Sequence, residues 1–298
     1  MDDRRPASVR LATWNCFGAP QSLEDFLEGR PFWPERLAAP SVIEALSCFD
    51  IVCIQENFVG GVHERLEALR IAGGFSDLWH DPPGPDRDDK TLVGAGLVIL
   101  SRFPVEARFL RLPRGVGADG FARKGAALAE VRLPGGRELF LVNTHLQADD
   151  GRVSPEECLS VRKAQIEVLA DALAEHLARG VPTVLCGDLN VPCGTTEYEG
   201  VLSRRLGASL TDLTARAGLV TYDTEENDVA RAFHEGGPER ALIDYVWTSK
   251  RVSPERVALE LVAPLGELSG CPSQYGGRAF ASDHFGVGVT ITIGGLGA

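Results

Sequence analysis

The sequence has no excess of positive charge. Its 298 residues include 30 Lys and Arg against 42 Asp and Glu, so the formal net charge is −12. A protein this acidic has no general attraction for the phosphates of a nucleic acid duplex. The composition therefore weakens nucleic acid as a substrate without excluding it, because a local basic groove can coexist with an acidic surface.

The cysteines form no zinc-binding pattern. There are seven, none in a Cys-x-x-Cys pair, and the spacings from Cys48 to Cys53 and from Cys186 to Cys193 match no zinc site. Cys16, Cys48, Cys53 and Cys186 lie in apolar runs, where a free thiol behaves as a small hydrophobe. The odd count and this placement predict buried free thiols and a reduced compartment.

Long apolar stretches, internal repeats and low-complexity tracts are also missing. The first ten residues, MDDRRPASVR, cannot form the core of a signal peptide, and no run is long enough to cross a bilayer. We therefore expect a cytoplasmic, monomeric protein without a transmembrane segment. The composition is alike on both sides of the loop-like segment 81–89, DPPGPDRDD, which predicts one domain over 1–298 with a core of about 8–294.

Short apolar runs separated by Gly and Pro clusters predict strands that are covered on both faces. One long helix is clearly marked, because Ser154 can act as N-cap, Pro155 follows at the first helical position and Glu157 closes a capping box, before Gly180 ends the helix. Shorter helices are predicted over 62–70 and about 196–205. The predicted strands are VRLATWN, DIVCIQE, VGAGLVILS, KGAALAEVRL, ELFLVNTH, PTVLCGD, ALIDYVW and FGVGVTITI.

Polar side chains recur where these apolar runs end. Taken singly, most have ordinary explanations: a solvated strand end, a turn, or a structural histidine held by a hydrogen bond. Asp244 is harder to explain in this way, because it sits between Ile243 and Tyr245 and a buried carboxylate costs several kcal/mol without a partner. The residues concerned are Asn15, Glu56, His145, Asp188, Asn190, Asp244, Asp283 and His284.

Taken together, these side chains are the groups that metal-assisted acid–base chemistry needs. They comprise carboxylates, imidazoles and amides, and no thiolate. Oxygen-rich sites suit Mg²⁺, or Mn²⁺ as an alternative, and a Mg²⁺ site with open coordination positions is the usual arrangement for chemistry at phosphate. If the strand ends gather at one sheet edge, the sequence predicts such a site there.

Six short motifs, in this order, carry a family resemblance: WN, QE, NTHL, GDLN, IDY and SDH. From Leu11 to about Ile293 the sequence resembles the endonuclease/exonuclease/phosphatase superfamily, whose members are similar to deoxyribonuclease I. The resemblance implies an α/β (α+β) fold, a four-layer sandwich of two packed mixed β-sheets flanked by helices. It also implies a Mg²⁺-dependent phosphodiesterase in which water attacks the phosphorus in line with the leaving group.

The resemblance further implies a role for each polar residue. Glu56 would hold the cation, assisted by Asn15 and supported by Asp283, while His284 would be the general base, oriented by Asp244. The remaining three residues would act on the water and the phosphate: Asp188 would orient the water or hold a second cation, and Asn190 and His145 would contact phosphate oxygens.

Several stretches resemble the sphingomyelinase C branch of this superfamily: NTHLQA, VRKAQIEVL, DLNVPCGTTEY, TYDTEEN and the Lys-Gly pair at 124–125. A phospholipid or small diester substrate is the resulting expectation. Lys124 would then meet a phosphate oxygen, the alternative being a solvated lysine at a strand edge. Asp149 and Asp150 are expected to form a solvated turn, the alternative being that they face a choline cation.

The sequence departs from that branch in SGCPSQYGGRAF, before Ser282, where the only aromatic residues are Tyr275 and Phe280. This weakens the case for a bilayer substrate, and the glycines there suggest a loop that could cover a small soluble diester. Two other functions stay open: a nuclease, or a binding and scaffold protein without catalysis. A nuclease would need a cationic stripe, for which the candidates are Arg102, Arg108, Arg111, Arg114, Arg123 and Lys124.

Overall fold

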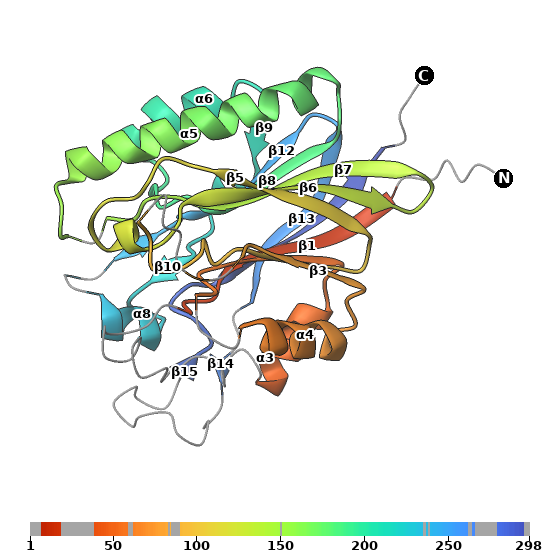
Figure 1. The fold of residues 1–298 in the computed structure, drawn as a ribbon, viewed down its shortest axis with the longest axis horizontal. Helices are drawn as coiled ribbons and strands as arrows, with labels where there is room; N and C mark the ends of the chain where they lie inside the picture. Colours follow the sequence, from red (N-terminus) through yellow and green to blue (C-terminus); the bar gives the residue numbers. More distant parts are fainter. Residues whose placement is uncertain are drawn as a thin grey trace.

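Two six-stranded β-sheets pack face to face (Figure 1). The computed structural model describes residues 7–18, 39–58, 62–82, 84, 90–149, 151–234, 237, 239–261, 264–265 and 279–294. In spatial order the first sheet contains β13 (Val252–Leu261), β16 (Gly286–Ile293), β1 (Ala7–Asn15), β2 (Ile51–Gln55), β4 (Val98–Ser101) and β3 (Asp77–His80). The second contains β5 (Val105–Arg111), β6 (Gly125–Leu133), β7 (Arg137–His145), β8 (Thr183–Asp188), β12 (Asp244–Ser249) and β9 (Leu210–Asp212).

Helices and two short ladders complete the described part of the chain. The ladders pair β10 (Tyr222–Asp223) with β11 (Arg240–Ala241) and β14 (Pro264–Leu265) with β15 (Ala279–Phe280). The helices are α3 (Pro40–Ser47), α4 (Val62–Ala72), α5 (Pro155–Ala178), α6 (Arg204–Leu206), α7 (Leu213–Ala217) and α8 (Asp228–Phe233), with a 3₁₀ turn η1 (Gly117–Phe121) and a π-helical turn η2 (Tyr198–Ser203).

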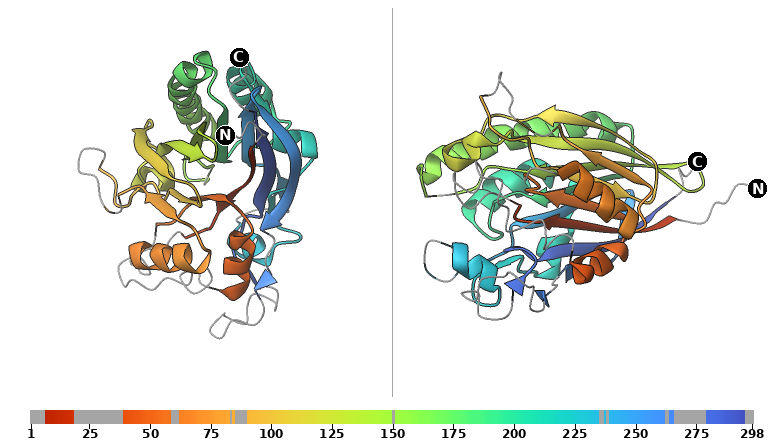
Figure 2. Two further views of the ribbon diagram at one scale, coloured as in Figure 1. Left: turned by 90° about the vertical axis from the view of Figure 1, so that its right-hand side faces the viewer. Right: turned by 60° about the horizontal axis from the view of Figure 1, so that its bottom comes forward.

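The layers follow from side chains that alternate between two buried faces of each strand. In β2, Ile51 and Cys53 face the second sheet, while Val52 and Ile54 pack towards α3 and α4. In β7, Leu139 and Leu141 enter the space between the sheets, and Phe140 and Val142 pack beneath α5. Both strands are therefore apolar on both faces along these residues. The result is the predicted four-layer sandwich, with α5 on one outer side and α3 and α4 on the other (Figure 2).

The predicted elements are found with small changes of extent. Ser154 caps α5 by accepting a hydrogen bond from the Glu157 N–H, and α5 ends two residues before Gly180. The helix expected over about 196–205 is a π-helical turn that continues into α6. VGAGLVILS contributes only its last four residues to β4. ALIDYVW is divided between β11, which ends at Ala241, and β12, which begins at Asp244, so Asp244 is the first residue of a strand rather than its middle.

Chain direction brings the ends of four central strands to one edge. β1 runs parallel to β2, with Asn15 beside Gln55, and β7 runs parallel to β8, with His145 beside Asp188. β12 runs antiparallel to β8, so its first residue, Asp244, also lies beside Asp188. This arrangement of strands therefore brings together polar residues, such as Asn15 and Asp244, that are more than 200 positions apart in the sequence.

A buried polar link ties the two sheets together just behind this edge. The Gln55 amide donates to Asn143 Oδ1 (2.7 Å) and to Thr13 Oγ1 (3.0 Å), and the Asn143 amide donates to the carbonyls of Ile54 and Val98. These side chains are fully buried. Because an unpaired amide in this position would cost about 1–3 kcal/mol, the link fixes how the sheets meet at that edge.

Two further expectations can be compared with the described residues. Cys16, Cys53 and Cys186 are buried free thiols as predicted, but Cys48 is exposed, because it lies at the C-terminus of α3, where the helix surface meets solvent. Among the described residues, no helix is both long and apolar enough to span a membrane.

Candidate active site

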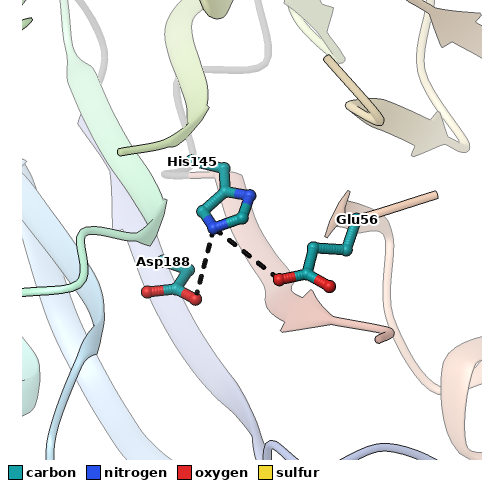
Figure 3. A group of neighbouring side chains, drawn as sticks. All are labelled: Glu56, His145 and Asp188. Carbon is teal, nitrogen blue, oxygen red and sulfur yellow. Dashed lines mark ion pairs between the residues drawn. The ribbon is translucent and has the colours of Figure 1, made fainter. Parts of the chain in front are cut away.

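Four of the predicted residues meet between the sheets. The Asn15 amide nitrogen donates to Glu56 Oε1 and to Asp188 Oδ2, each at 2.9 Å. The Nε2 atom of His145 lies 3.7 Å from both of those carboxylate oxygens, as Figure 3 shows. Glu56 and Asn15 come from the first sheet, and His145 and Asp188 from the second. The site therefore exists only when the sheets are packed together.

His284 and Asp244 form the second half of the site. The imidazole Nδ1 lies 2.8 Å from Asp244 Oδ2, and Nε2 lies 3.8 Å from Asp188 Oδ2. Asp244 is fully buried, and its other oxygen, Oδ1, has no hydrogen-bond partner among the described residues. The hydrogen bond fixes the imidazole so that Nε2 faces the cluster around Asp188. The His284 imidazole is therefore the partner that compensates the buried carboxylate of Asp244.

Asp283 and Asn190 border the same cluster. Asp283 Oδ1 lies 4.0 Å from His284 Nε2 and 3.2 Å from Ser282 Oγ. The Asn190 backbone N–H donates to Asp188 Oδ1, and its side-chain amide donates to the Leu146 carbonyl. All eight strand-end residues named above therefore lie in one connected group of side chains.

Backbone geometry explains the sequence GDLN. Gly187 has φ +137° and approaches β7 so closely that a Cβ atom would lie 1.9 Å from the Thr144 carbonyl oxygen. Only glycine fits there. Glu56 and Asn190 adopt left-handed φ values of 59° and 52°, which non-glycine residues rarely take. Strain of this kind is often concentrated at functional sites, here at the two residues that leave strands β2 and β8.

Burial makes the carboxylates unusually basic. Burial raises the pKa of Glu56 to about 7, with the nearby Asp188 and Asp119 adding to the rise, against the hydrogen bond from Asn15. Burial and the charge of Asp244 raise the pKa of Asp188 to about 7, and burial and Glu56 do the same for Asp283. Three buried carboxyls that resist ionisation mark a site that lacks compensating positive charge.

The two histidines are shifted in opposite directions. Burial, together with the positive charges of Lys124 and His284, holds the pKa of His145 well below its ordinary value, so this imidazole is neutral. Burial opposes protonation of His284 as well, but Asp244, Asp283 and Asp188 outweigh it and raise the pKa of His284 well above the ordinary value. The same fold thus produces one neutral imidazole and one that gains a proton readily.

Two sets of side chains have the spacing of metal ligands. Ligand atoms of Glu56, His145 and Asp188 lie within 4.8 Å of one another, and so do those of Asp188, Asp244 and His284. Asn15 differs from the expectation in one respect: its Oδ1 accepts the Phe17 N–H, so the atom that faces the carboxylates is a donor. In this geometry Asn15 positions Glu56 and Asp188 rather than offering an oxygen ligand.

Lys124 is not a solvated strand-edge lysine. It is 3% exposed, and its Nζ donates to the Leu146 carbonyl and pairs with Asp119 Oδ2, each at 2.9 Å. Asp119 also accepts the Ala148 N–H. Since Leu146 follows His145 directly, these contacts hold the segment that carries the imidazole. The predicted contact of Lys124 with phosphate stays a prediction.

Arg162 holds the next part of the same segment. This guanidinium is 1% exposed and pairs through two nitrogens with Asp149 and through two with Glu197, and it also donates to the Gln147 carbonyl. Asp149 is therefore engaged by an arginine, which makes it neither a free choline ligand nor a fully solvated turn residue. Asp150 lies outside the described residues, as do Tyr275 and Gly270, Gly276 and Gly277.

Some residues of the site escaped prediction. The Thr221 hydroxyl accepts the N–H groups of Ile243 and Asp244, and the Tyr222 ring packs edge-on against His284 with centroids 5.3 Å apart. Ser282 Oγ donates to the Asn15 carbonyl at 2.6 Å. Thr221 and Tyr222 begin the stretch TYDTEEN and Ser282 begins the motif SDH, but none of the three interrupts an apolar run, so no role could be assigned to them from the sequence. Asn143 and Gln55 did carry a signal, a polar side chain inside an apolar strand.

Comparison with known proteins agrees with this geometry. The model of the Endonuclease/Exonuclease/phosphatase family matches residues 12–284. The chain belongs to this family. Its matched segment contains seven of the eight strand-end residues before its final residue, His284, which is the eighth. The family assignment and the two-sheet architecture were therefore both predictable from the sequence motifs.

The individual relatives and solved structures share only about a fifth to a quarter of their residues with this chain. Sphingomyelinase C 2 of Leptospira interrogans is 26% identical over 290 residues, which cover 93% of this chain and 45% of that protein. The structure of a beta toxin variant from Staphylococcus aureus with bound magnesium ions covers 97% of this chain and 100% of its own, with 18% identity and a TM-score of 0.72. A structure of D. rerio TDP2 with a single-strand DNA product has 18% identity and a TM-score of 0.64, covering 96% and 99%.

These two structures share the fold of this chain. The chain spans less than half the length of the first Leptospira relatives that it matches, 44% of one and 45% of the other. Proteins similar to this chain therefore include relatives named sphingomyelinase C and a structure that contains a DNA product, so the substrate has to be argued from the residues of this chain.

Proposed function

We propose that this protein is a divalent-metal-dependent phosphodiesterase that hydrolyses a phospholipid or small diester, as the name of its sphingomyelinase C relatives indicates for them. The observation that carries the proposal is the convergence of Glu56, Asp188 and His145 from two sheets, with the His284–Asp244 pair beside them. This set combines oxygen ligands, a proton acceptor and a neutral imidazole in one buried space.

The residues fit a divalent cation. Glu56 and Asp188 present two buried carboxylates whose raised pKa values reflect uncompensated charge. Beside them His145 Nε2 is buried without a hydrogen-bond partner among the described residues. Mg²⁺ prefers carboxylate oxygens, with Mn²⁺ as an alternative, so Glu56 and Asp188 would hold the ion, and Asp283 lies close enough to support it. When bound, the cation supplies positive charge that offsets the charge developing on phosphate oxygens.

His284 is the proposed general base. Its Nδ1–H donates to Asp244 Oδ2, which leaves the Nε2 lone pair directed towards Asp188 and free to accept a proton from the attacking water. Asp244 then stabilises the imidazolium. In the absence of a cation, the surrounding carboxylates raise the pKa of His284, and a divalent ion among them would lower it towards the working range of a base.

The neutral His145 is the proposed phosphate contact. Its Nε2 faces the centre of the cluster, and a neutral imidazole can donate one hydrogen bond to a phosphate oxygen without adding charge. The side chain of Asn190 is held next to His145, because its amide donates a hydrogen bond to the carbonyl of Leu146, the residue after His145. Fixed donors of this kind often contribute about 10²–10³ in rate. Lys124 supports the geometry from behind by holding the Leu146 carbonyl.

The arginines favour a lipid or small diester over nucleic acid. Arg102 donates to the Phe49, Ser47, Gly73 and Gly74 carbonyls, Arg114 donates to the Gly120 carbonyl, and Arg123 pairs with Asp81. These three guanidinium groups hold loops together, and Lys124 is buried. Of the six candidate cations only Arg108, Arg111 and Arg114 are exposed, and the last of these is bonded to the Gly120 carbonyl. Together with the net charge of −12, this weakens the case for a nuclease.

The test is a substrate panel with the purified protein in Mg²⁺, Mn²⁺ or EDTA. We expect hydrolysis of sphingomyelin or glycerophosphodiesters to exceed nicking of plasmid DNA, and EDTA to abolish it. Efficient nicking of DNA without activity on lipids or small diesters would establish the nuclease alternative. Equal and very slow release of nitrophenolate from bis(p-nitrophenyl) phosphate in Mg²⁺ and in EDTA would indicate a scaffold protein.

A further inference from the structure

Two of the exposed large apolar side chains lie next to each other. Among the described residues the large apolar side chains that stand out as exposed are Ile71 (69%), Leu92 (44%) and Phe121 (54%). Ile71 is alone on α4. The Leu92 N–H donates to the Phe121 carbonyl at 2.7 Å, so these two residues are direct neighbours.

The local backbone turns both side chains outward. Val93 and Ala122 pair as a parallel β-bridge. Leu92, which lies in a bend, and Phe121, the last residue of η1, directly precede the two bridged residues, and both side chains are exposed. Ala122, by contrast, is buried and Val93 is half-buried. We call Leu92 and Phe121 the apolar pair.

Flanking residues keep the apolar pair on a rigid frame. Arg114 donates twice to the Gly120 carbonyl, and Arg123 pairs with Asp81 and lies 5.0 Å above the Phe109 ring. Asp81 in turn accepts N–H groups from the chain beyond the apolar pair, at Ala95 and Leu97. The apolar pair therefore stays exposed because the frame prevents it from folding back onto the core.

The frame is attached to the candidate active site at two points. Lys124, three residues after Phe121, donates to the carbonyl of Leu146, the neighbour of His145. The Gly96 carbonyl, four residues after Leu92, accepts the N–H of Asn57, the neighbour of Glu56. In Figure 1 the yellow 3₁₀ turn η1, which ends at Phe121, lies at the same end of the molecule as β10, whose Tyr222 contacts His284.

We propose that the apolar pair is the contact through which this protein rests on a zwitterionic lipid surface. Exposed apolar side chains on a rigid frame lower their free energy by entering the boundary between head groups and acyl chains. The net charge of −12 opposes an anionic surface, so a zwitterionic one is the matching partner. The position beside the candidate site would bring head-group phosphodiesters to it, and this last step rests on the proposed function.

Vesicle sedimentation tests the contact without reference to catalysis. Phosphatidylcholine vesicles with sphingomyelin are compared with the same vesicles containing phosphatidylserine, in EDTA to suppress turnover. We expect wild type to bind the zwitterionic vesicles more tightly. The double variant Leu92→Ser with Phe121→Ser should lose on the order of tenfold or more in partition coefficient. Ile71→Ser, which removes the most exposed of the large apolar side chains that the structure describes, is the matched control and should bind as wild type does.

Catalytic assays then separate this inference from the proposed function. The double variant should hydrolyse soluble bis(p-nitrophenyl) phosphate as wild type does, while its activity on sphingomyelin in vesicles falls by the same factor as binding. Specific binding without any hydrolysis would support the contact and overturn the proposed function.

Three results would overturn the contact. In the first, wild type stays in the supernatant with zwitterionic vesicles. In the second, it binds vesicles that contain phosphatidylserine at least as tightly as zwitterionic ones. In the third, the Ile71→Ser control loses as much binding as the double variant. Sedimentation velocity tests whether the apolar pair contacts a second copy of this chain instead. If wild type is a dimer and the double variant is a monomer, the apolar pair belongs to a self-association interface.

Discussion

The two ends of the double sheet are built from the same strands but differ in chemistry. At one end β1, β7 and β8 finish in Asn15, His145 and Asp188, with Glu56 just beyond β2. At the other end the space between the sheets is closed by apolar side chains of the same or neighbouring strands: Val9, Val131, Leu133, Leu139, Val252 and Ile293. We call these the polar end and the closed end.

Burial does not explain this difference, because both ends are buried to a similar degree. Asp188 is 1% exposed and Leu139 is 0% exposed. A hydrophobic closure would be the more stable choice at either end, since buried carboxylates cost several kcal/mol each without compensation. The polar end is therefore less stable than an apolar closure would be. The raised pKa values of Glu56 and Asp188 reflect the unfavourable free energy of burying these carboxylates.

The largest expected effect lies at the polar end. His284→Ala removes the proposed proton acceptor, so kcat for bis(p-nitrophenyl) phosphate in Mg²⁺ should fall by about 10²–10⁴-fold. Thermal stability should fall as well, because buried Asp244 loses the imidazole that compensates it, so kcat is compared at a temperature where the variant is folded. Asp244→Asn is the companion variant, which keeps the imidazole but replaces its carboxylate partner with a neutral amide. An unchanged rate in both variants would remove His284 from the mechanism.

A cavity at the closed end should have the opposite pattern. Leu139 is fully buried between the sheets, and Leu139→Ala should lower the free energy of unfolding by about 2–5 kcal/mol, measured by urea denaturation. Where the variant is folded, its kcat should stay within about twofold of wild type, because the polar end is held by its own hydrogen bonds. A loss of kcat as large as that of His284→Ala would show that the two ends are not independent.

The smallest effect is a dependence of stability on pH and metal. In the metal-free fold, Glu56 and Asp188 have pKa values of about 7, above ordinary values of 4.5 and 3.8. Between those limits the folded state binds protons that the unfolded chain has released. The free energy of unfolding therefore falls as pH rises from about 5 to 8.

The raised pKa of His284 acts in the same direction. Mg²⁺ should oppose this loss, because the cation replaces protons among the carboxylates. We expect the Tm difference between Mg²⁺ and EDTA to be a few degrees at pH 8 and smaller at pH 5.5. A constant or inverted difference would contradict the assignment of the cation to Glu56 and Asp188.

Local signals in the sequence were enough for most elements of the fold. The capping residues of α5 mark its start at Pro155, and the apolar runs mark the central strands. The edge strands of both sheets were missed: the predicted strands include none of β13, β3, β5 and β9, which mix charged or polar residues with apolar ones, and α3 was not foreseen. Such segments gain their structure from the neighbours they pack on, and periodicity alone does not reveal that support.

The list of strand-end residues was also readable from the sequence, because a polar group that ends an apolar run is visible locally. Their use was not. Asn15 turned out to present its amide nitrogen to the carboxylates, and Lys124 to hold the Leu146 carbonyl, since these orientations depend on groups far away in the chain. The opposite pKa shifts of His145 and His284 likewise depend on which charges the fold places around each ring.

The amino-acid sequence by itself determined the family, the two sheets and the chemical groups available at the strand ends, because hydrophobic periodicity and short motifs are local properties. Tertiary structure decided how those groups act, since distances of 2.8 to 4.0 Å between residues such as Asp188 and His284 arise only when parallel strand pairs from two sheets end at one edge. It also decided that Leu92 and Phe121 stand together on the surface beside that edge.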